Sequence, residues 1–193
     1  MADKPLSGGN PERGWGQMFS GFLTPDIHVD NRALNGRSTR SFRNEGHWEL
    51  VRKKLRKGDY VFIQFGHNDQ KADTARHSDA ETDYKINLGK YIDETRKVGA
   101  IPILFTPIVR RKFNPDGTLA DTHGKYTDAV RAVAKEKQVL LIDLNKMSAS
   151  LLERYGQEKS TSLFVWVEPG IYAALPEGKA TQICVFNAAL ESK

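Results

Sequence analysis

Four short runs of apolar and β-branched residues, separated by segments with helical spacing, constrain the fold of this chain more than any other feature. We expect strands at Ile27–Asn31, Tyr60–Phe65, Ile101–Thr106 and Val139–Asp143. The last three are continuous apolar runs, as expected for strands that are covered on both faces. Short strands alternating with helices are typical of βαβ units. The pattern therefore predicts the α/β class with a parallel sheet.

The segments between these runs carry apolar residues at the 3.6-residue spacing of a helix. The clearest stripe predicts a helix that ends before Gly99, with the members Tyr84, Leu88, Tyr91, Ile92 and Thr95. The same spacing predicts helices over Trp48–Leu55, Tyr126–Val133 and Met147–Tyr155. A length of 193 residues, with 39% hydrophobic and 27% charged residues, fits a single folded domain over 1–193.

Composition excludes several classes of protein. No apolar run approaches the roughly 20 residues that cross a bilayer, so we expect no membrane span. The single cysteine, Cys184, excludes an internal disulfide and a multi-cysteine metal site, and we expect neither a metal nor an organic cofactor. Met1–Pro5 contains no apolar signal core, so the chain as written is expected in the cytoplasm.

The formal charge of +5 favours an acidic partner. Nucleic acid, a membrane surface and an anionic polysaccharide all satisfy that condition, and charge alone does not choose among them. The basic stretch Arg52–Lys57 lies in a helix-like segment and is interpreted as a solvated face. No glycine-rich phosphate loop follows a strand, which argues against a nucleotide-binding module.

Two loops that follow predicted strands carry polar residues suited to chemistry, and parallel sheets bind ligands at the carboxyl ends of their strands. In the loop after Tyr60–Phe65, the amide of Asn68 can donate a hydrogen bond to a developing oxyanion. In the loop after Ile27–Asn31, Gly36 lets a substrate approach the backbone N–H closely. The alternative is that Asn68 and Asp69 only build an Asx turn and a helix cap, and that Gly36 only makes a turn.

These two loops resemble the second and third signature blocks of the SGNH (GDSL-type) hydrolases, through Gly36 and through Gly66-x-Asn68-Asp69. More specifically, the chain is similar to the rhamnogalacturonan acetylesterases in four segments that match in order and spacing: Pro11–Gln17, Asn35–Thr39, Gln64–Gln70 and Thr106–Pro107. The similarity covers about residues 11–179 and leaves 180–193 as an atypical tail.

The resemblance implies a flavodoxin-like, three-layer α/β/α sandwich that lacks the family's first, central strand. It implies hydrolysis of acetyl esters on a pectic polysaccharide, with Gly36 and Asn68 in the oxyanion hole and no cofactor. The partner would be an acetylated pectic polysaccharide or oligosaccharide, rather than nucleic acid or a membrane, and the oligomeric state stays open. Members of the family are typically secreted or periplasmic.

Further side chains are expected to contact the substrate, namely Arg37, Arg40, His67, Asp69 and His123. For the two arginines, pairing with carboxylates or facing solvent is an equal alternative. A structural or solvent-facing role is favoured for His123, which precedes a predicted helix.

The family's nucleophile and base have no counterpart among the 193 residues. The nucleophilic serine of Gly-Asp-Ser-Thr would precede Met1, and the late Asp-x-x-His would follow Ala180, where the chain reads Thr-Gln-Ile-Cys-Val-Phe. Neither Ser7, in a glycine-rich loop, nor Ser38, in another block, is a convincing substitute, because a serine needs an adjacent base. A misassigned start and a frameshift near Ala180 would explain both ends.

Two expectations follow from these missing parts. The chain is expected to show no measurable acetylesterase activity, with a non-catalytic polysaccharide-binding remnant as the alternative function. It is also expected to be marginally stable or prone to aggregation, because burial of about five apolar side chains of a central strand contributes about 7–15 kcal/mol as an upper estimate. A whole domain nets only about 5–15 kcal/mol.

Overall fold

Three of the four predicted strands form one parallel sheet in the computed structural model, which describes residues 1–173, 175–180 and 186–187. They are β2 (Tyr60–Gln64), β3 (Ile101–Phe105) and β4 (Leu140–Ile142), in the order β2-β3-β4. In the parallel register, Ile63 lies opposite Leu104, which in turn lies opposite Leu141. The predicted α/β class with a parallel sheet is therefore confirmed.

The described residues divide into two compact units. The sheet belongs to the unit formed by Gly36–Ile108 and His123–Met147, called the sheet unit below. The other unit comprises Met1–Asn35, Val109–Thr122 and Ser148–Lys193, and is called the outer unit.

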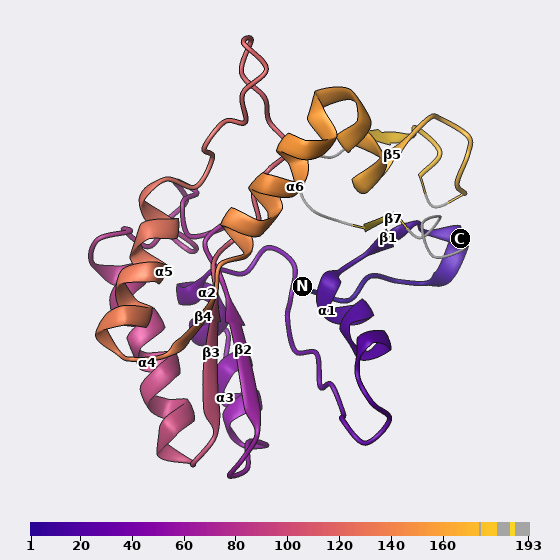
Figure 1. Cartoon of the computed structure of the whole chain (residues 1–193). Helices are drawn as coiled ribbons and strands as arrows, with labels where there is room; N and C mark the ends of the chain where they lie inside the picture. The colour runs from indigo at the N-terminus through magenta and orange to yellow at the C-terminus, as the bar shows by residue number, and fades with distance from the viewer. Residues whose placement is uncertain (174, 181–185, 188–193) are drawn as a thin grey trace. The chain divides into compact units, whose positions relative to one another are not determined.

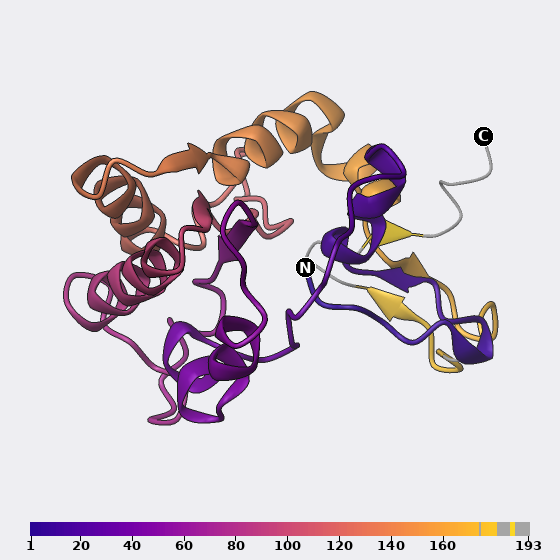
Figure 2. The same cartoon turned by 90° about the horizontal axis from the view of Figure 1, so that it is seen from below.

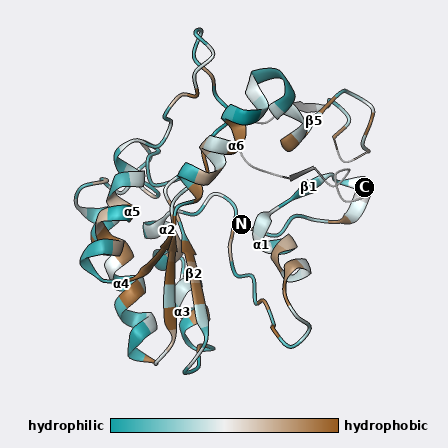
Figure 3. Ribbon diagram, viewed as in Figure 1, coloured by the Kyte–Doolittle hydropathy of each residue, from teal (hydrophilic) through white to brown (hydrophobic). Residues whose placement is uncertain are grey.

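Four helices pack on the sheet within the sheet unit: α2 (Thr39–Asn44), α3 (His47–Arg52), α4 (Asp83–Lys97) and α5 (Lys125–Glu136). Figures 1 and 2 both show α4 and α5 side by side along the sheet. Because alternate strand residues face opposite sides, Val61 and Ile63 join the core beneath the helices, while Phe62 and Phe105 meet on the other face with ring centroids 5.0 Å apart. The strands are accordingly the most hydrophobic segments of this unit (Figure 3).

One continuous core joins these helices to the sheet. The predicted stripe of α4 is its centre, since Tyr84, Leu88, Tyr91 and Ile92 are at most 1% exposed. Trp48 from α3 and Val130 from α5 pack into the same cluster. The helices predicted around Tyr84 and Tyr126 are thus confirmed.

Two predictions about local structure were wrong. Ile27–Asn31 is not a strand: Ile27 is 52% exposed, and no described strand runs beside it to complete a ladder of hydrogen bonds. The helix predicted over Trp48–Leu55 ends at Arg52, so that Leu55 lies beyond it. The bounds of the other elements differ from the predictions only at their ends.

The outer unit is built from short elements around a smaller apolar cluster of Val109, Leu152 and Phe164. Its longest helix, α6, begins at the end of the sheet unit and has a break at Gly156, where φ is 71°. Two short antiparallel pairs, β1 with β7 and β5 with β6, complete it. Its elements are η1 (Ser7–Gly9), β1 (Glu12–Arg13), α1 (Trp15–Met18), η2 (Phe19–Phe22), α6 (Leu144–Lys159), η3 (Ser160–Leu163), β5 (Trp166–Val167), β6 (Lys179–Ala180) and β7 (Phe186–Asn187).

Most of the segment interpreted as an atypical tail, namely 181–185 and 188–193, lies outside the described residues. None of the described helices is long and apolar enough to cross a membrane.

Candidate active site

The candidate residues all belong to the sheet unit, and except for Arg40 on α2 they lie in its loops. The loop 65–70 leaves β2, and the loop 36–38 leads into α2. Parallel strands end at one edge of their sheet, and this is where the sequence placed a polar site.

The buried side chain of Asp69 links the two loops through hydrogen bonds. Its Oδ1 accepts hydrogen bonds from the backbone N–H of Thr39 at 2.9 Å and from the Thr39 hydroxyl at 2.5 Å. Its Oδ2 accepts the N–H of Gly66 at 3.1 Å. The carboxyl is fully buried, and this burial raises its pKa above the ordinary value although the bonds from Thr39 and Gly66 oppose the shift. Asp69 therefore positions the loops and presents no surface to a ligand.

Asn68 also links these two loops, but its side chain is partly exposed. Its amide Nδ2 donates to the carbonyl oxygen of Arg37 at 3.0 Å, and the residue is partly exposed. Gly36 directly precedes Arg37, is exposed, and adopts a φ of 77°, a conformation that favours glycine. No atom lies within 4 Å of the position that a Cβ on Gly36 would occupy, so the space beside its backbone is open.

The start of α2 is fixed by a capping box. The hydroxyl of Ser38 accepts from the N–H of Ser41 at 3.1 Å, and the hydroxyl of Ser41 accepts from the N–H of Ser38 at 2.9 Å. Ser38 is 0% exposed. A buried, cap-forming hydroxyl is not placed to attack a substrate, in agreement with the rejection of Ser38 as nucleophile.

Packing against α4 holds this helix start in place. The hydroxyl of Tyr91 donates to the carbonyl of Thr39 at 2.9 Å, and the Asn87 amide donates to the Thr39 hydroxyl at 3.2 Å. Burial raises the pKa of Tyr91 far above its ordinary value, so the phenol stays protonated as a donor. Thr39 was not among the predicted site residues, although it connects Asn87 to Asp69.

Position 66 requires a glycine because neighbouring side chains pack closely against its backbone. Its φ is 128°, and a Cβ would lie 3.1 Å from the Pro107 ring and 3.3 Å from the Tyr84 hydroxyl. That hydroxyl donates to the carbonyl of Phe65 at 3.1 Å. A side chain at Gly66 would therefore displace the loop that carries Asn68.

The two histidines of the predicted set lie against each other. The Nε2 of His123 is 2.5 Å from the Nδ1 of His67, with ring centroids 4.4 Å apart. His123 is 3% exposed, whereas His67 is partly exposed beside Asn68. Fifty-six positions separate the pair in sequence, and no spacing pattern indicated their contact.

Both arginines of the predicted set form ion pairs. The Nε of Arg37 lies 2.8 Å from Glu45 Oε2, and this bond lowers the pKa of Glu45. A terminal nitrogen of Arg40 lies 2.6 Å from Asp83 Oδ2. The alternative of carboxylate pairing thus describes the structure, and the side chains of Arg37 and Arg40 are 39% and 35% exposed. The described residues contain no group of three or more metal-ligating side chains.

The model of the GDSL-like lipase/acylhydrolase family matches residues 2–164, which is most of the chain. The chain belongs to this family. The description of the family names lipases and acylhydrolases.

Individual relatives agree with the family. The chain is similar to rhamnogalacturonan acetylesterase RhgT of Bacillus subtilis, at 39% identity over 168 residues, covering 87% of this chain and 71% of RhgT. It is also similar to the probable rhamnogalacturonan acetylesterase YesY of the same organism, at 35% identity, covering 79% of this chain and 70% of YesY.

Solved structures agree on the fold. The structure of YxiM from Bacillus subtilis superposes with a TM-score of 0.76 at 30% identity, covering 85% of this chain but 46% of YxiM. The acetylxylan esterase Axe2 from Geobacillus stearothermophilus superposes with a TM-score of 0.56 at 22% identity, covering 72% of this chain and 65% of Axe2. At that identity Axe2 supports only the fold.

Proposed function

We propose that the chain acts on acetyl esters of a pectic polysaccharide such as rhamnogalacturonan, as the oxyanion-stabilising part of a carbohydrate acetylesterase. The substrate class follows the names of RhgT and YesY. The observation that carries the proposal is the hydrogen bond from the Asn68 amide to the Arg37 carbonyl, which brings both candidate donors into one site.

Asn68 and Gly36 each have an N–H group that can still donate a hydrogen bond. An asparagine amide has two N–H donors, and Asn68 uses one on Arg37. Among the residues that the structure describes, the backbone N–H of Gly36 has no acceptor. In this proposal, one N–H of Asn68 holds the loop, while the other donates together with the N–H of Gly36 to the carbonyl oxygen of an acetyl ester.

The chemistry assigns a role to each group. When a nucleophile attacks the acetyl carbonyl, negative charge develops on its oxygen, and donors set in advance stabilise that charge. Asp69 links the two loops that carry the donors, and the exposed faces of Arg37 and His67 are proposed to contact the sugar. The 193 residues contain neither Gly-Asp-Ser nor Asp-x-x-His. By themselves they are therefore expected to bind the ester without serine-dependent turnover.

Binding tests the acetyl site directly. Calorimetry would compare an acetylated rhamnogalacturonan oligosaccharide with the same oligosaccharide after chemical deacetylation. One hydrogen bond to the acetyl carbonyl predicts a preference of about 2- to 10-fold for the acetylated form. Asn68→Ala should abolish this preference. Asn114→Ala, which truncates an exposed asparagine in a turn of the outer unit, should keep it.

Equal affinity for both oligosaccharides would refute the acetyl site. Acetate release, measured in the same samples, separates the two forms of the proposal. Binding without release supports the alternative, a non-catalytic polysaccharide-binding role. Release above a heat-inactivated control would instead show that the chain is a complete esterase.

A further inference from the structure

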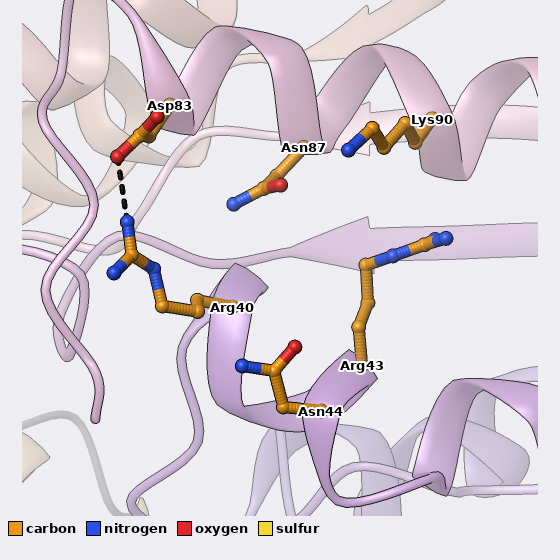
Figure 4. A pocket seen from close by; sticks show the side chains of 6 residues that line it. All are labelled: Arg40, Arg43, Asn44, Asp83, Asn87 and Lys90. Carbon is orange, nitrogen blue, oxygen red and sulfur yellow. Dashed lines mark hydrogen bonds and ion pairs between the residues drawn. The ribbon is translucent and has the colours of Figure 1, made fainter.

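A cationic hollow lies between α2 and α4, beside the site just described. It has a volume of about 280 Å³ and is lined by Arg40, Arg43, Asn44, Asp83, Asn87 and Lys90. Figure 4 shows the polar ends of Arg40, Asn44, Asn87 and Lys90 in the space between the two helices. Its lining therefore contains three cations, one carboxylate and two amides.

Ion pairs hold the two arginines in place and leave some of their N–H donors available. Arg43 bonds Glu94, which lies outside the lining, at 2.7 and 3.3 Å, and its guanidinium stacks 5.1 Å from the centre of the Tyr91 ring. Arg40 is held by Asp83 at 2.6 Å. A guanidinium carries five N–H donors, so each arginine retains donors for a ligand. Counting Glu94 with the lining, the hollow still has a net charge of +1.

Two lining groups are free. Among the residues that the structure describes, the Lys90 ammonium and the Asn44 amide have no hydrogen-bond or ion-pair partner, and both residues are exposed. The Asn87 amide donates to Thr39 and keeps its oxygen as an acceptor. An exposed ammonium in the same lining as two ion-paired guanidinium groups attracts a carboxylate, and the two amides of the lining suit the hydroxyls of a sugar.

We propose that this hollow binds the carboxylate of a uronic acid residue in an acidic polysaccharide. It begins at Arg40, next to the helix start that Asp69 ties to the Asn68 loop, so one chain of sugars can contact both places. The choice of a uronate rests on the pectic substrate proposed above. The hollow is a second contact that needs no acetyl group.

Oligogalacturonate without acetyl groups is the probe that isolates this contact. In calorimetry at low salt, Lys90→Glu should weaken its binding by about tenfold, because a charge-assisted bond is replaced by repulsion. Asn44→Asp, a second exposed change in the lining, should act in the same direction. Lys135→Glu on α5 makes the same change of charge at an exposed helical position and should alter the affinity less than about twofold.

Three results would overturn the proposal. Equal loss of affinity in Lys90→Glu and Lys135→Glu would reduce the effect to overall charge. Equal binding of carboxyl-reduced oligogalacturonate would show that the carboxylate is not recognised. Displacement of the oligosaccharide by an equal concentration of inorganic phosphate would show a general anion site. Since the probe carries no ester, these outcomes are independent of those that test the acetyl site.

Discussion

At the scale of single residues, the buried carboxyl of Asp69 has the clearest structural role. Its two oxygens accept three hydrogen bonds, from both donors of Thr39 and from Gly66, and it has no solvent-exposed surface. A carboxylate is an acceptor at both oxygens, whereas an amide is an acceptor at only one. This position therefore requires an acid, although burial of that acid raises its pKa.

The substitution Asp69→Asn tests the role. Its NH2 group must face either the donors of Thr39 or the N–H of Gly66, so at least one buried donor loses its acceptor. We expect the free energy of unfolding to fall by about 1.5–3 kcal/mol in urea titrations at neutral pH. An unchanged midpoint would show that Asp69 does not hold the loops.

The raised pKa of Asp69 also predicts how the difference in stability between wild type and Asp69→Asn depends on pH. Between the ordinary carboxyl pKa and the higher folded value, native Asp69 keeps a proton that the unfolded chain has released, so stability falls as pH rises through this window. Wild type should thus gain stability over Asp69→Asn as pH falls towards 4. Asp73 serves as a control with the opposite pH dependence. Its hydrogen bond from Arg76 lowers its pKa, so its contribution to the stability of the fold is lost as pH falls.

At the scale of elements, α2 is short but carries much of the site. Six residues are too few for a helix that is stable in isolation, so α2 depends on its cap and on packing against α4. Gly36 precedes it, and Arg40, Arg43 and Asn44 are on it. Its first turn therefore sets the positions of both the proposed acetyl site and the proposed carboxylate site.

Removal of the cap measures this dependence. Ser38→Ala leaves the N–H of Ser41 without its acceptor and should cost about 1 kcal/mol of unfolding free energy, within a range of roughly 0.5–2 kcal/mol. Ser150→Ala, at an exposed position inside α6, should change the stability by less than about 0.5 kcal/mol because alanine favours helices. Equal effects of the two changes in thermal melts would contradict a special role for the cap.

At the scale of the whole molecule, the edge of the parallel sheet is expected to influence behaviour in solution. Among the described strands, β2 pairs only with β3, so it is an edge strand of the three-stranded sheet. The strand is apolar and its first residue, Tyr60, is 66% exposed. An exposed apolar edge strand is a template for pairing with another chain.

We therefore expect the chain to aggregate on mild heating and to be only marginally stable. Tyr60→Lys places a charge on the edge and should raise the onset temperature of light scattering. Tyr155→Lys, which changes an exposed tyrosine on α6, should leave the onset unchanged. A sharp, cooperative melt of a monomeric wild-type chain would contradict the expected instability.

The sequence alone determined the elements whose burial follows a simple period. The stripe from Tyr84 to Thr95 predicted α4, and continuous apolar runs predicted β2, β3 and β4, because strands of a parallel sheet are covered on both faces. The loops of Gly36 and Asn68 were predicted to meet because parallel strands end at one edge. This reason holds for the loop of Asn68, which follows β2, but not for the loop of Gly36, because Ile27–Asn31 is not a strand.

Only the tertiary structure decided what depends on a partner distant in sequence. Ile27–Asn31 has the composition of a strand, yet no described strand pairs with it through backbone hydrogen bonds. Asp69 belongs to a predicted site motif, yet Thr39, 30 positions away, binds its carboxylate out of solvent. His67 and His123 meet across 56 positions, and Arg40 turns to Asp83. Local periodicity carries no information about such contacts, because the packing of the sheet and its helices brings these residues together.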